Sequence, residues 1–167
     1  MSKGGRPFKV SDELNQLRFL IENNEIENLK RVLKAFGIDA HDENKRTALI
    51  WASFFNKIDL LKWLIENNAN PNQQDKIGYS ALHFCAQEKN TEAAKILIEN
   101  GANSNIKDIH DNSPLWTSTL NSKDNFGILK LLLQNGASPD EKNLHGRSPN
   151  DIYRSMYEKD IKDVINS

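Results

Sequence analysis

The chain has 167 residues, of which 38% are hydrophobic and 27% are charged, a composition typical of a single globular domain. The 22 Lys and Arg residues nearly balance the 23 Asp and Glu residues, and both signs are scattered, which argues against the clustered positive charge of nucleic-acid-binding proteins. Polar residues interrupt every apolar cluster before it reaches the roughly 18 residues needed to cross a bilayer, and the single cysteine excludes an internal disulfide.

Residues 1–10 contain basic residues and the pair Gly4-Gly5, with no apolar segment behind them of the kind that a secretory signal needs. We expect this segment to be a flexible tail. Together with the charge balance and the cysteine count, it favours a cytoplasmic protein that binds neither nucleic acid nor a membrane.

Residues 11–41 form the first predicted unit of a repeat. One helix is expected to carry Leu14, Leu17, Phe19, Leu20 and Ile21, and a second helix to carry Ile26, Leu29, Val32 and Leu33. The segment lacks the polar tip that opens the later units. We interpret it as an N-terminal cap, because the open end of a repeat stack needs a unit with a polar outer face.

Three full repeats follow, over residues 42–74, 75–107 and 108–142. Asp42, Asp75 and Asp108 are 33 residues apart, and Leu49, Leu82 and Leu115 repeat the same step. A fixed period of this length indicates stacked supersecondary units that bury a continuous core between them.

Each repeat shows the same order of features. A polar tip is followed by a hydroxyl residue at the expected N-cap of a first helix, namely Thr47, Ser80 or Ser113. Small residues line that helix, and a second helix has a wide apolar face: Leu60, Leu61, Trp63, Leu64 and Ile65; Ala93, Ala94, Ile96, Leu97 and Ile98; Ile128, Leu129, Leu131, Leu132 and Leu133. The unit closes at Asn68, Gly101 or Gly136, residue types that adopt the left-handed conformation ending a helix.

The third repeat is longer, since Gly101 and Gly136 are 35 residues apart while Leu82 and Leu115 are 33 apart. The two extra residues are expected within 121–125, either as a tolerated surface insertion or as a recognition loop. Residues 143–167 restart the pattern at Gly146, but Asn150 stands where a leucine is expected. This last segment is interpreted as a C-terminal cap.

The segments Gly78-Tyr79-Ser80-Ala81-Leu82-His83-Phe84-Cys85-Ala86 and Leu97-Ile98-Glu99-Asn100-Gly101-Ala102-Asn103 resemble the ankyrin repeat signature. The resemblance covers about residues 14–165. It implies an all-α solenoid of stacked helix-turn-helix units with connecting β-turn or hairpin tips, about five repeats including the caps. It also implies that His83 is structural and hydrogen-bonds between neighbouring turns.

Proteins that resemble this one usually bind partner proteins on a concave surface formed by the tips and the first helices. Positions there that vary between repeats are the candidate partner-binding residues: Arg46, Phe54, Phe55, Ile77, Tyr79, Gln87, Glu88, Ile109, His110, Asn112, Trp116, Leu120 and Asn121. Exposed aromatics and arginine are typical of interface hot spots, although one of the two phenylalanines could instead turn into the core. Among the tryptophans, Trp51 and Trp63 are expected in the core, and Trp116, which aligns with His83, at the surface.

The sequence contains none of the phosphate-loop, Gly-x-Ser-x-Gly or His-Glu-x-x-His motifs, and Cys85 is expected to be a buried structural thiol. We therefore predict a non-enzymatic protein without cofactor or metal that binds another protein, as an inhibitor or adaptor, and is a monomer when free. Three alternatives stay open. The protein could be a bacterial immunity protein that neutralises a toxin, could bind a metal or small ligand through the tip residues His110 and His145, or could self-assemble as a structural component.

Overall fold

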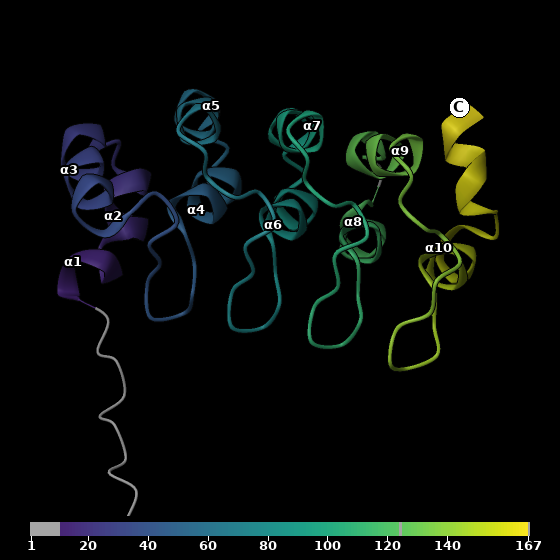
Figure 1. Ribbon diagram of the computed structural model, residues 1–167. Coiled ribbons are helices and arrows are strands. Elements are labelled where there is room, and N and C mark those ends of the chain that lie inside the picture. The colour runs from purple at the N-terminus through teal and green to yellow at the C-terminus, as the bar shows by residue number, and fades with distance from the viewer. Residues whose placement is uncertain (1–10, 124, 167) are drawn as a thin grey trace, which may run out of the picture.

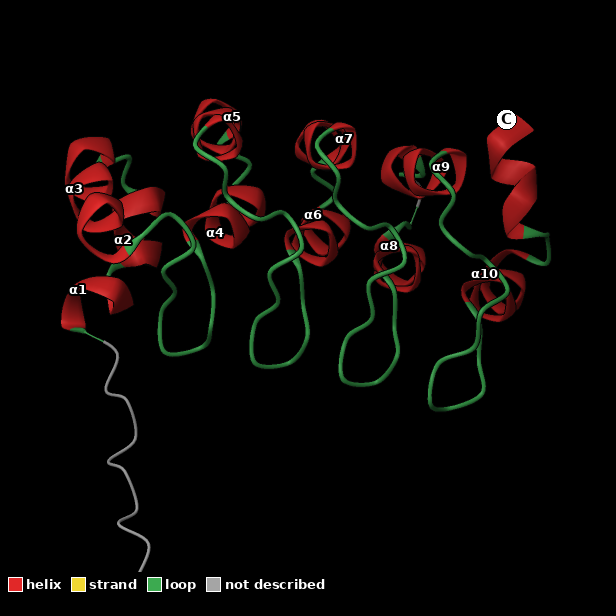
Figure 2. Ribbon diagram, viewed as in Figure 1, coloured by secondary structure: helices red, strands yellow, loops and turns green. Residues whose placement is uncertain are grey.

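The computed structural model describes residues 11–123 and 125–166, so the predicted tail of residues 1–10 lies outside the described residues. Within them the fold is all-α, as predicted, with two rows of helices joined by loops (Figures 1 and 2). The elements in chain order are α1 Asp12–Asn15, α2 Leu17–Glu22, α3 Ile26–Phe36, α4 Ala48–Phe54, α5 Ile58–Glu66, α6 Ala81–Glu88, α7 Thr91–Glu99, α8 Pro114–Asn121, α9 Gly127–Gln134, α10 Pro149–Tyr157 and the 3₁₀ helix η1 Ile161–Asn166. No helix of the described residues combines the length and the apolar character needed to cross a membrane.

The two rows follow the order of helices within each repeat. The first helices α4, α6, α8 and α10 pack side by side in one row, while α5, α7, α9 and η1 form the second row. The tips project from the row of first helices, all toward the same side of the molecule (Figure 1). We call the surface made by the tips and the first helices the inner face, and the surface made by the second helices the outer face.

The predicted helix boundaries are confirmed at both ends of the repeats. Thr47, Ser113 and Ser148 accept a hydrogen bond from the backbone N–H three residues later, and Ser80 forms a capping box with His83. At the other end, Asn68, Gly101 and Gly136 have positive φ angles of 65°, 86° and 80°. These residues turn the chain out of the second helix and toward the next tip.

The core lies between the two rows and is continuous along the stack. The repeating leucines Leu49, Leu82 and Leu115 are at most 1% exposed, and the small residues Ala52 and Ala86 of the first helices are fully buried. Small side chains at these positions allow neighbouring first helices to approach closely, which the close packing of α4, α6 and α8 requires.

The prediction of one continuous first helix in the N-terminal cap is wrong. The chain forms two short helices, α1 and α2, separated at Gln16, whose backbone is in a turn-like conformation with φ −86° and ψ −5°. Phe19 is also 55% exposed rather than part of the apolar face. On α2 the buried stripe consists of Leu17, Leu20 and Ile21, and the helical period of 3.6 residues turns Phe19 away from it.

The apolar faces of the second helices are narrower than predicted. On α5, Leu60, Leu61 and Leu64 are buried, but Trp63 packs against the core and is only partly buried. The residues at the equivalent position of the next two helices, Ile96 and Leu131, are partly buried as well. The prediction that Trp63 belongs to the buried stripe is therefore wrong, because consecutive residues of a helix cannot all face one neighbour.

The C-terminal cap replaces an apolar contact by hydrogen bonds. Asn150 is 4% exposed, and its amide nitrogen donates to carboxylate oxygens of Asp140 and Asp160 at 3.0 and 3.2 Å. Its amide oxygen accepts from the backbone N–H of Ile161 at 3.0 Å, which ties α10 to η1. The asparagine at the leucine position thus closes the stack with a satisfied polar group.

The two extra residues of the third repeat lie where the sequence predicts them. α8 ends at Asn121 and α9 begins at Gly127, whereas only Lys89 and Asn90 separate α6 from α7. The connection is three residues longer and α9 is one residue shorter than α7, which gives the two extra residues of the repeat. Residue 124 of this connection lies outside the described residues. Ser122 at the start of the connection is buried and donates from its hydroxyl to the carbonyl of Thr119 at 2.9 Å.

Candidate partner-binding surface

Each tip is shaped by one side chain at its base. Oδ1 of Asp42 accepts hydrogen bonds from the backbone N–H groups of Asn44 and Arg46, at 2.8 and 2.9 Å. The same pair of bonds is made by three equivalent residues in the later repeats, which are Asp75, Asp108 and Asn143. Because an amide oxygen replaces the carboxylate in the last tip without loss of either bond, this position needs an acceptor rather than a charge.

Neighbouring tips are joined through their backbones. The N–H of Lys76 donates to the carbonyl of Asn44 at 2.9 Å, that of Ile109 to Ile77 at 3.1 Å, and that of Leu144 to His110 at 3.1 Å. The first tip has no tip before it, and the backbone N–H of Glu43 donates instead to the side-chain oxygen of Asn15 at 2.9 Å. The tips therefore form one connected row from which their side chains project.

An aromatic cluster lies on the inner face beside the first two full tips. The ring of Phe54 makes edge contacts with Phe55 and Phe84, with ring centres 4.9 and 6.0 Å apart, and Tyr79 lies 5.5 Å from Phe84. Trp51 contacts both Phe54 and Phe55, at 5.8 and 5.9 Å. Three of these rings come from α4 and α6, Phe55 follows the last residue of α4, and Tyr79 comes from a tip, so the cluster joins two repeats.

Two arginines lie over this cluster. The guanidinium carbon of Arg46 is 5.0 Å from the ring centres of both Trp51 and Phe84, and that of Arg18 is 5.5 Å from Trp51 and 6.0 Å from Phe55. Such distances allow cation–π attraction. We call the surface formed by Arg18, Arg46, Trp51, Phe54, Phe55, Tyr79 and Phe84 the aromatic–arginine patch.

Of the predicted site residues, Arg46, Phe54, Phe55 and Tyr79 come together in this patch. Phe54 and Phe55 are both only partly buried, so neither one is lost to the core. Trp51 is 4% exposed, as predicted for a core residue, but its indole supports both arginines.

The sequence interpretation did not include Arg18, Trp51 and Phe84 in the site. The repeat period could have identified them, because Arg18, Trp51 and Phe84 follow one another at intervals of 33 residues. Residues in the same register of a stacked repeat lie next to one another. A register alignment extended into the cap would have placed Arg18 beside Trp51.

A hollow of about 170 Å³ opens at the N-terminal end of the patch. It is lined mainly by polar residues of α1, α2 and the first full tip, with Trp51 as its aromatic wall: Asn15, Arg18, Asp42, Glu43, Asn44, Arg46 and Trp51. Asp42 directs its second carboxylate oxygen away from solvent, where it accepts from the indole N–H of Trp51 at 3.0 Å. The hollow therefore offers guanidinium groups and the exposed Glu43 to a partner, while Asp42 is engaged.

Tyr79 is held in the patch by His83. The two rings are stacked with centres 4.8 Å apart and planes 22° from parallel. Nδ1 of His83 accepts from the backbone N–H of Ser80 at 3.1 Å, and Nε2 lies 3.1 Å from the carbonyl of Asn112 in the next repeat. Because Nδ1 accepts a hydrogen bond, the ring proton is on Nε2, which donates to the carbonyl of Asn112. Burial lowers the pKa of His83. The predicted bridging role of His83 is confirmed.

The other predicted residues lie along the tips and at the ends of the first helices. Ile77, Ile109 and Leu120 are 44%, 55% and 50% exposed. At the end of α6, Gln87 donates to Glu88 at 2.8 Å, and at the end of α8, Asn121 donates to the carbonyl of Thr117 at 2.8 Å. These side chains share the inner face with the aromatic–arginine patch.

Asn112 has a structural role that the sequence did not show. Its amide nitrogen donates to Asp108 at 3.1 Å, and its amide oxygen accepts from Asn143 at 2.8 Å. With its carbonyl engaged by His83, Asn112 connects a first helix and two tips.

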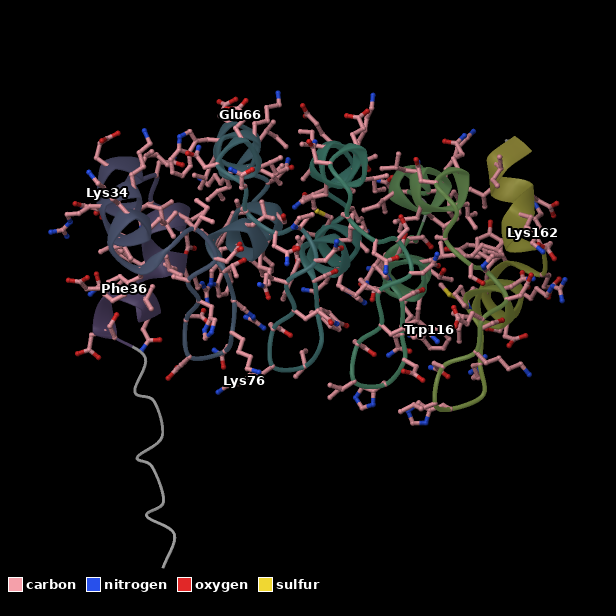
Figure 3. The ribbon with its side chains drawn as sticks, in the orientation of Figure 1. Lys34, Phe36, Glu66, Lys76, Trp116 and Lys162 are labelled. Atoms are coloured by element: carbon pink, nitrogen blue, oxygen red, sulfur yellow. The ribbon has the colours of Figure 1, made fainter. Side chains whose placement is uncertain are left out.

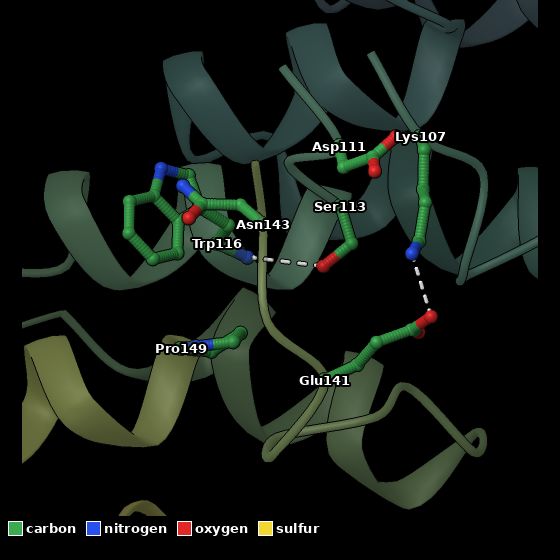
Figure 4. Close-up of a pocket in the computed structure, with 7 residues that line it drawn as sticks. All are labelled: Lys107, Asp111, Ser113, Trp116, Glu141, Asn143 and Pro149. Atoms are coloured by element: carbon green, nitrogen blue, oxygen red, sulfur yellow. Dashed lines mark hydrogen bonds and ion pairs between the residues drawn. The ribbon is translucent and has the colours of Figure 1, made fainter. Parts of the chain in front are cut away.

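Trp116 is partly buried, and it lies on α8 toward the C-terminal half of the stack (Figures 3 and 4). It lines a small hollow of about 10 Å³ together with Lys107, Asp111, Ser113, Glu141, Asn143 and Pro149. Lys107 forms an ion pair with Glu141 at 2.6 Å across this hollow. The hollow is too small for a ligand larger than water, so the exposed part of the indole can only contact a partner from outside.

His110 and His145 are neighbours on successive tips, as their register predicts, with ring centres 6.0 Å apart. Among residues 11–123 and 125–166, no group of three or more His, Cys, Asp or Glu side chains could hold a metal ion. Cys85 is fully buried, and burial raises the pKa of its thiol to about 12, which keeps the nucleophilic thiolate scarce.

A family model described as ankyrin repeats in three copies matches residues 9–75 and 52–143. Among curated proteins, human neurogenic locus notch homolog protein 1 is 35% identical over 83 residues, which cover 50% of this chain and 3% of that protein. The E3 ubiquitin-protein ligase Ufd4 of Drosophila melanogaster is 31% identical over 60% of this chain and 4% of its own length. The IkB-like protein of African swine fever virus is 38% identical over 29% of this chain and 23% of its own length. The chain thus spans only a small part of the proteins that it matches.

Proposed function

This chain belongs to the ankyrin repeat family, whose repeats are generally protein–protein interaction modules, and we propose that it binds a partner protein through the aromatic–arginine patch on its inner face. The observation that carries this proposal is the arrangement of Arg18 and Arg46 over a continuous group of aromatic rings. Aromatic and arginine side chains at the centre of an interface contribute most of its binding energy.

Polar residues of the inner face that surround the aromatic–arginine patch suit the rim of an interface. Glu43, Asn44 and Lys76 are exposed on the first two full tips, and Gln87 and Glu88 end α6. A partner that places an apolar side chain against Phe55 and a hydrogen-bond acceptor against the arginines would satisfy both parts of the patch.

The proposed consequence of binding is inhibition of the partner or its attachment to a third protein. The buried His83 bridges backbone groups, and burial raises the pKa of the Cys85 thiol, so we assign a catalytic role to neither side chain. We therefore propose an inhibitor or adaptor, and an immunity protein that neutralises a toxin is one form of inhibitor. A reducing compartment such as the cytoplasm suits the buried, unpaired Cys85.

A pull-down from native lysate tests the proposal. We compare the wild type with a Phe54→Ala, Phe55→Ala, Tyr79→Ala variant and with a Phe55→Ala, Arg18→Ala variant that leaves the contacts with Phe84 intact. Phe36→Ala is the matched control, because Phe36 is 44% exposed, ends α3 and is not part of the aromatic–arginine patch. We expect both patch variants, and not the control, to lose a partner that the wild type recovers. Equal recovery of every partner by all four proteins would contradict the patch.

The neighbouring tip histidines support a second candidate function, binding of a divalent metal ion. His110 and His145 are exposed, and their rings are close enough for both to face one ion. They would supply two of the four ligands of a structural zinc site. Titration calorimetry with zinc decides this candidate. Heat that disappears in His110→Ala supports it, and a flat titration contradicts it.

A further inference from the structure

The outer face has an opening between α3 and α5. In the second row, α5 packs against α7, α7 against α9 and α9 against η1, but α3 and α5 make no comparably close contact. Two adjoining hollows of about 370 and 220 Å³ occupy the space between them. Their lining is mostly apolar and is shared by the two helices: Ile26, Lys30, Leu33, Lys34, Ile38, Asp59, Leu60, Trp63 and Asn67. We call these two hollows the α3–α5 groove.

Trp63 stands at the centre of this groove and lines both hollows. Leu33 and Leu60, which are 4% and 6% exposed, form the apolar floor on either side of it. A partly exposed tryptophan above an apolar floor is the side-chain arrangement that most often contributes strongly to binding. The groove is therefore suited to receive apolar side chains.

The charges at the rim of the groove are mainly positive. The ammonium group of Lys30 lies 5.6 Å from the ring centre of Trp63 and 3.2 Å from Glu27. Lys34 is exposed and has no ion-pair partner among the described residues. The lining carboxylate, Asp59, sits in the first turn of α5, where the helix dipole already stabilises its charge. Asp59 keeps its negative charge but lines only the smaller hollow, whereas the larger hollow is lined by Lys30 and Lys34 and by no carboxylate.

The walls of the groove decide the backbone conformation of an occupant. Both walls are α-helices, whose backbone donors and acceptors are used within the helix except at its ends. An extended peptide would leave its own backbone groups without partners on this apolar floor, whereas a helix satisfies them internally. The longer wall, α3, has 11 residues and is about 16 Å long, which is enough for about three turns of a second helix.

We propose that the α3–α5 groove binds an amphipathic helix of a partner protein, with apolar side chains against Trp63 and acidic side chains against Lys30 and Lys34. Lys34 lies on the outer helices near one end of the stack, well away from the tip that carries Lys76 (Figure 3). The groove is separate from the aromatic–arginine patch, so the protein has a second binding surface that does not depend on the first.

Two synthetic peptides of about 18 residues, a length at which isolated helices become populated, test the proposal on the full chain. Both carry leucine at the same helical spacing, one with glutamate and the other with lysine on the polar face. Fluorescence anisotropy measures the affinity of both peptides for four proteins. These are the wild type, Trp63→Ala, the double charge variant that combines Lys30→Glu with Lys34→Glu, and Phe55→Ala as a control on the inner face.

We expect the wild type to prefer the acidic peptide by at least about fivefold, and the double charge variant to reverse this preference. Trp63→Ala should weaken binding about 30-fold, as expected for the loss of a central tryptophan, while Phe55→Ala changes it less than about twofold. Amide chemical shifts of the wild type should move on α3 and α5. Circular dichroism melts confirm that each variant is folded.

Three results would overturn the proposal. Equal affinity for both peptides in the wild type and the charge variant would mean that the lysines do not select the occupant. Shift changes confined to the tips and first helices would place the peptide elsewhere. A wild-type dimer in light scattering that disappears in Trp63→Ala would show that a second copy of this chain, rather than a partner helix, covers the groove.

Discussion

Arg46 donates from Nε to a carboxylate oxygen of Asp75 at 3.1 Å, and this contact joins the first full repeat to the second. The Asp75 side chain is only 2% exposed and that of Arg46 is 26% exposed, so the pair is largely shielded from water. The other carboxylate oxygen of Asp75 accepts from the backbone of its own tip. The same arginine thus supports both the stack and the aromatic–arginine patch.

Replacing Arg46 by alanine should lower the free energy of unfolding by about 1–3 kcal/mol, because it leaves one oxygen of a buried carboxylate without its partner. Arg46→Lys keeps the charge but loses the planar group over Trp51 and Phe84, and should recover only part of the loss. Urea unfolding measures both variants. An alanine variant within about 0.5 kcal/mol of the wild type, the range of an ordinary surface change, would show that the pair does not stabilise the stack.

Gly78→Ala should destabilise the protein more than the same change at another glycine with the same backbone conformation. Gly78 and Gly136 both have φ of 80°, but a Cβ on Gly78 would lie 2.7 Å from Cα of Asp108, whereas a Cβ on Gly136 meets nothing within 4 Å. Gly136→Ala should therefore cost about 1 kcal/mol for the left-handed conformation alone. Gly78→Ala should cost at least about 2 kcal/mol, since the neighbouring tip must also move.

Thermal or urea unfolding of the two glycine variants, measured side by side, checks this difference. Equal losses would mean that the tips can separate freely and that the backbone bond between Ile77 and Ile109 contributes little.

The stability of the protein should fall when the pH drops from 7.5 to 5.5, and His83 should account for part of the loss. Burial holds the pKa of His83 below its ordinary value of 6.5 in the folded protein. The unfolded chain therefore takes up a proton near pH 6.5 that the folded protein does not. The contribution is fully present above pH 6.5 and is lost progressively as the pH falls below it.

Urea unfolding at pH 7.5 and 5.5 measures this dependence in the wild type, in His83→Gln and in His41→Gln. His83→Gln should be less stable than the wild type at pH 7.5 but should lose less stability on acidification. His41 is exposed, and its variant should behave as the wild type does. If His83→Gln kept the full pH dependence, another group would be responsible.

The thiol of Cys85 should resist alkylation in the folded protein. Burial raises its pKa to about 12, so the thiolate fraction at pH 8 is on the order of one in ten thousand. Iodoacetamide followed by mass spectrometry should show no adduct under native conditions and complete modification in urea. Rapid native modification would indicate that α6 opens from the core without global unfolding.

The period of 33 residues was sufficient to predict the stack, the N-caps and the helix ends, because each depends on short-range chemistry repeated in the same register. Ser80, for example, caps α6 through contacts within four residues. The same reasoning did not predict how segments far apart in the sequence pack against each other. The opening between α3 and α5 beside Trp63 depends on how the cap packs against the first full repeat, and it has no local signal.

The candidate site was predicted in part for the same reason. Phe54, Phe55 and Tyr79 were found as aromatic residues at positions that vary between repeats, which a comparison of the three full repeats shows. Arg18 was missed because it belongs to the cap, and its position over Trp51 becomes evident only when the cap is aligned with the full repeats. Asn112 was interpreted as a surface residue, although its carbonyl and amide connect a first helix with two tips.

The bonds between neighbouring tips use main-chain atoms of Asn44, Lys76, Ile77, Ile109, His110 and Leu144. Any amino acid other than proline could supply these N–H groups and carbonyls, so mutations at these outward positions leave the framework intact. Natural variation or directed evolution could therefore change what this row recognises while the fold of the protein stays the same.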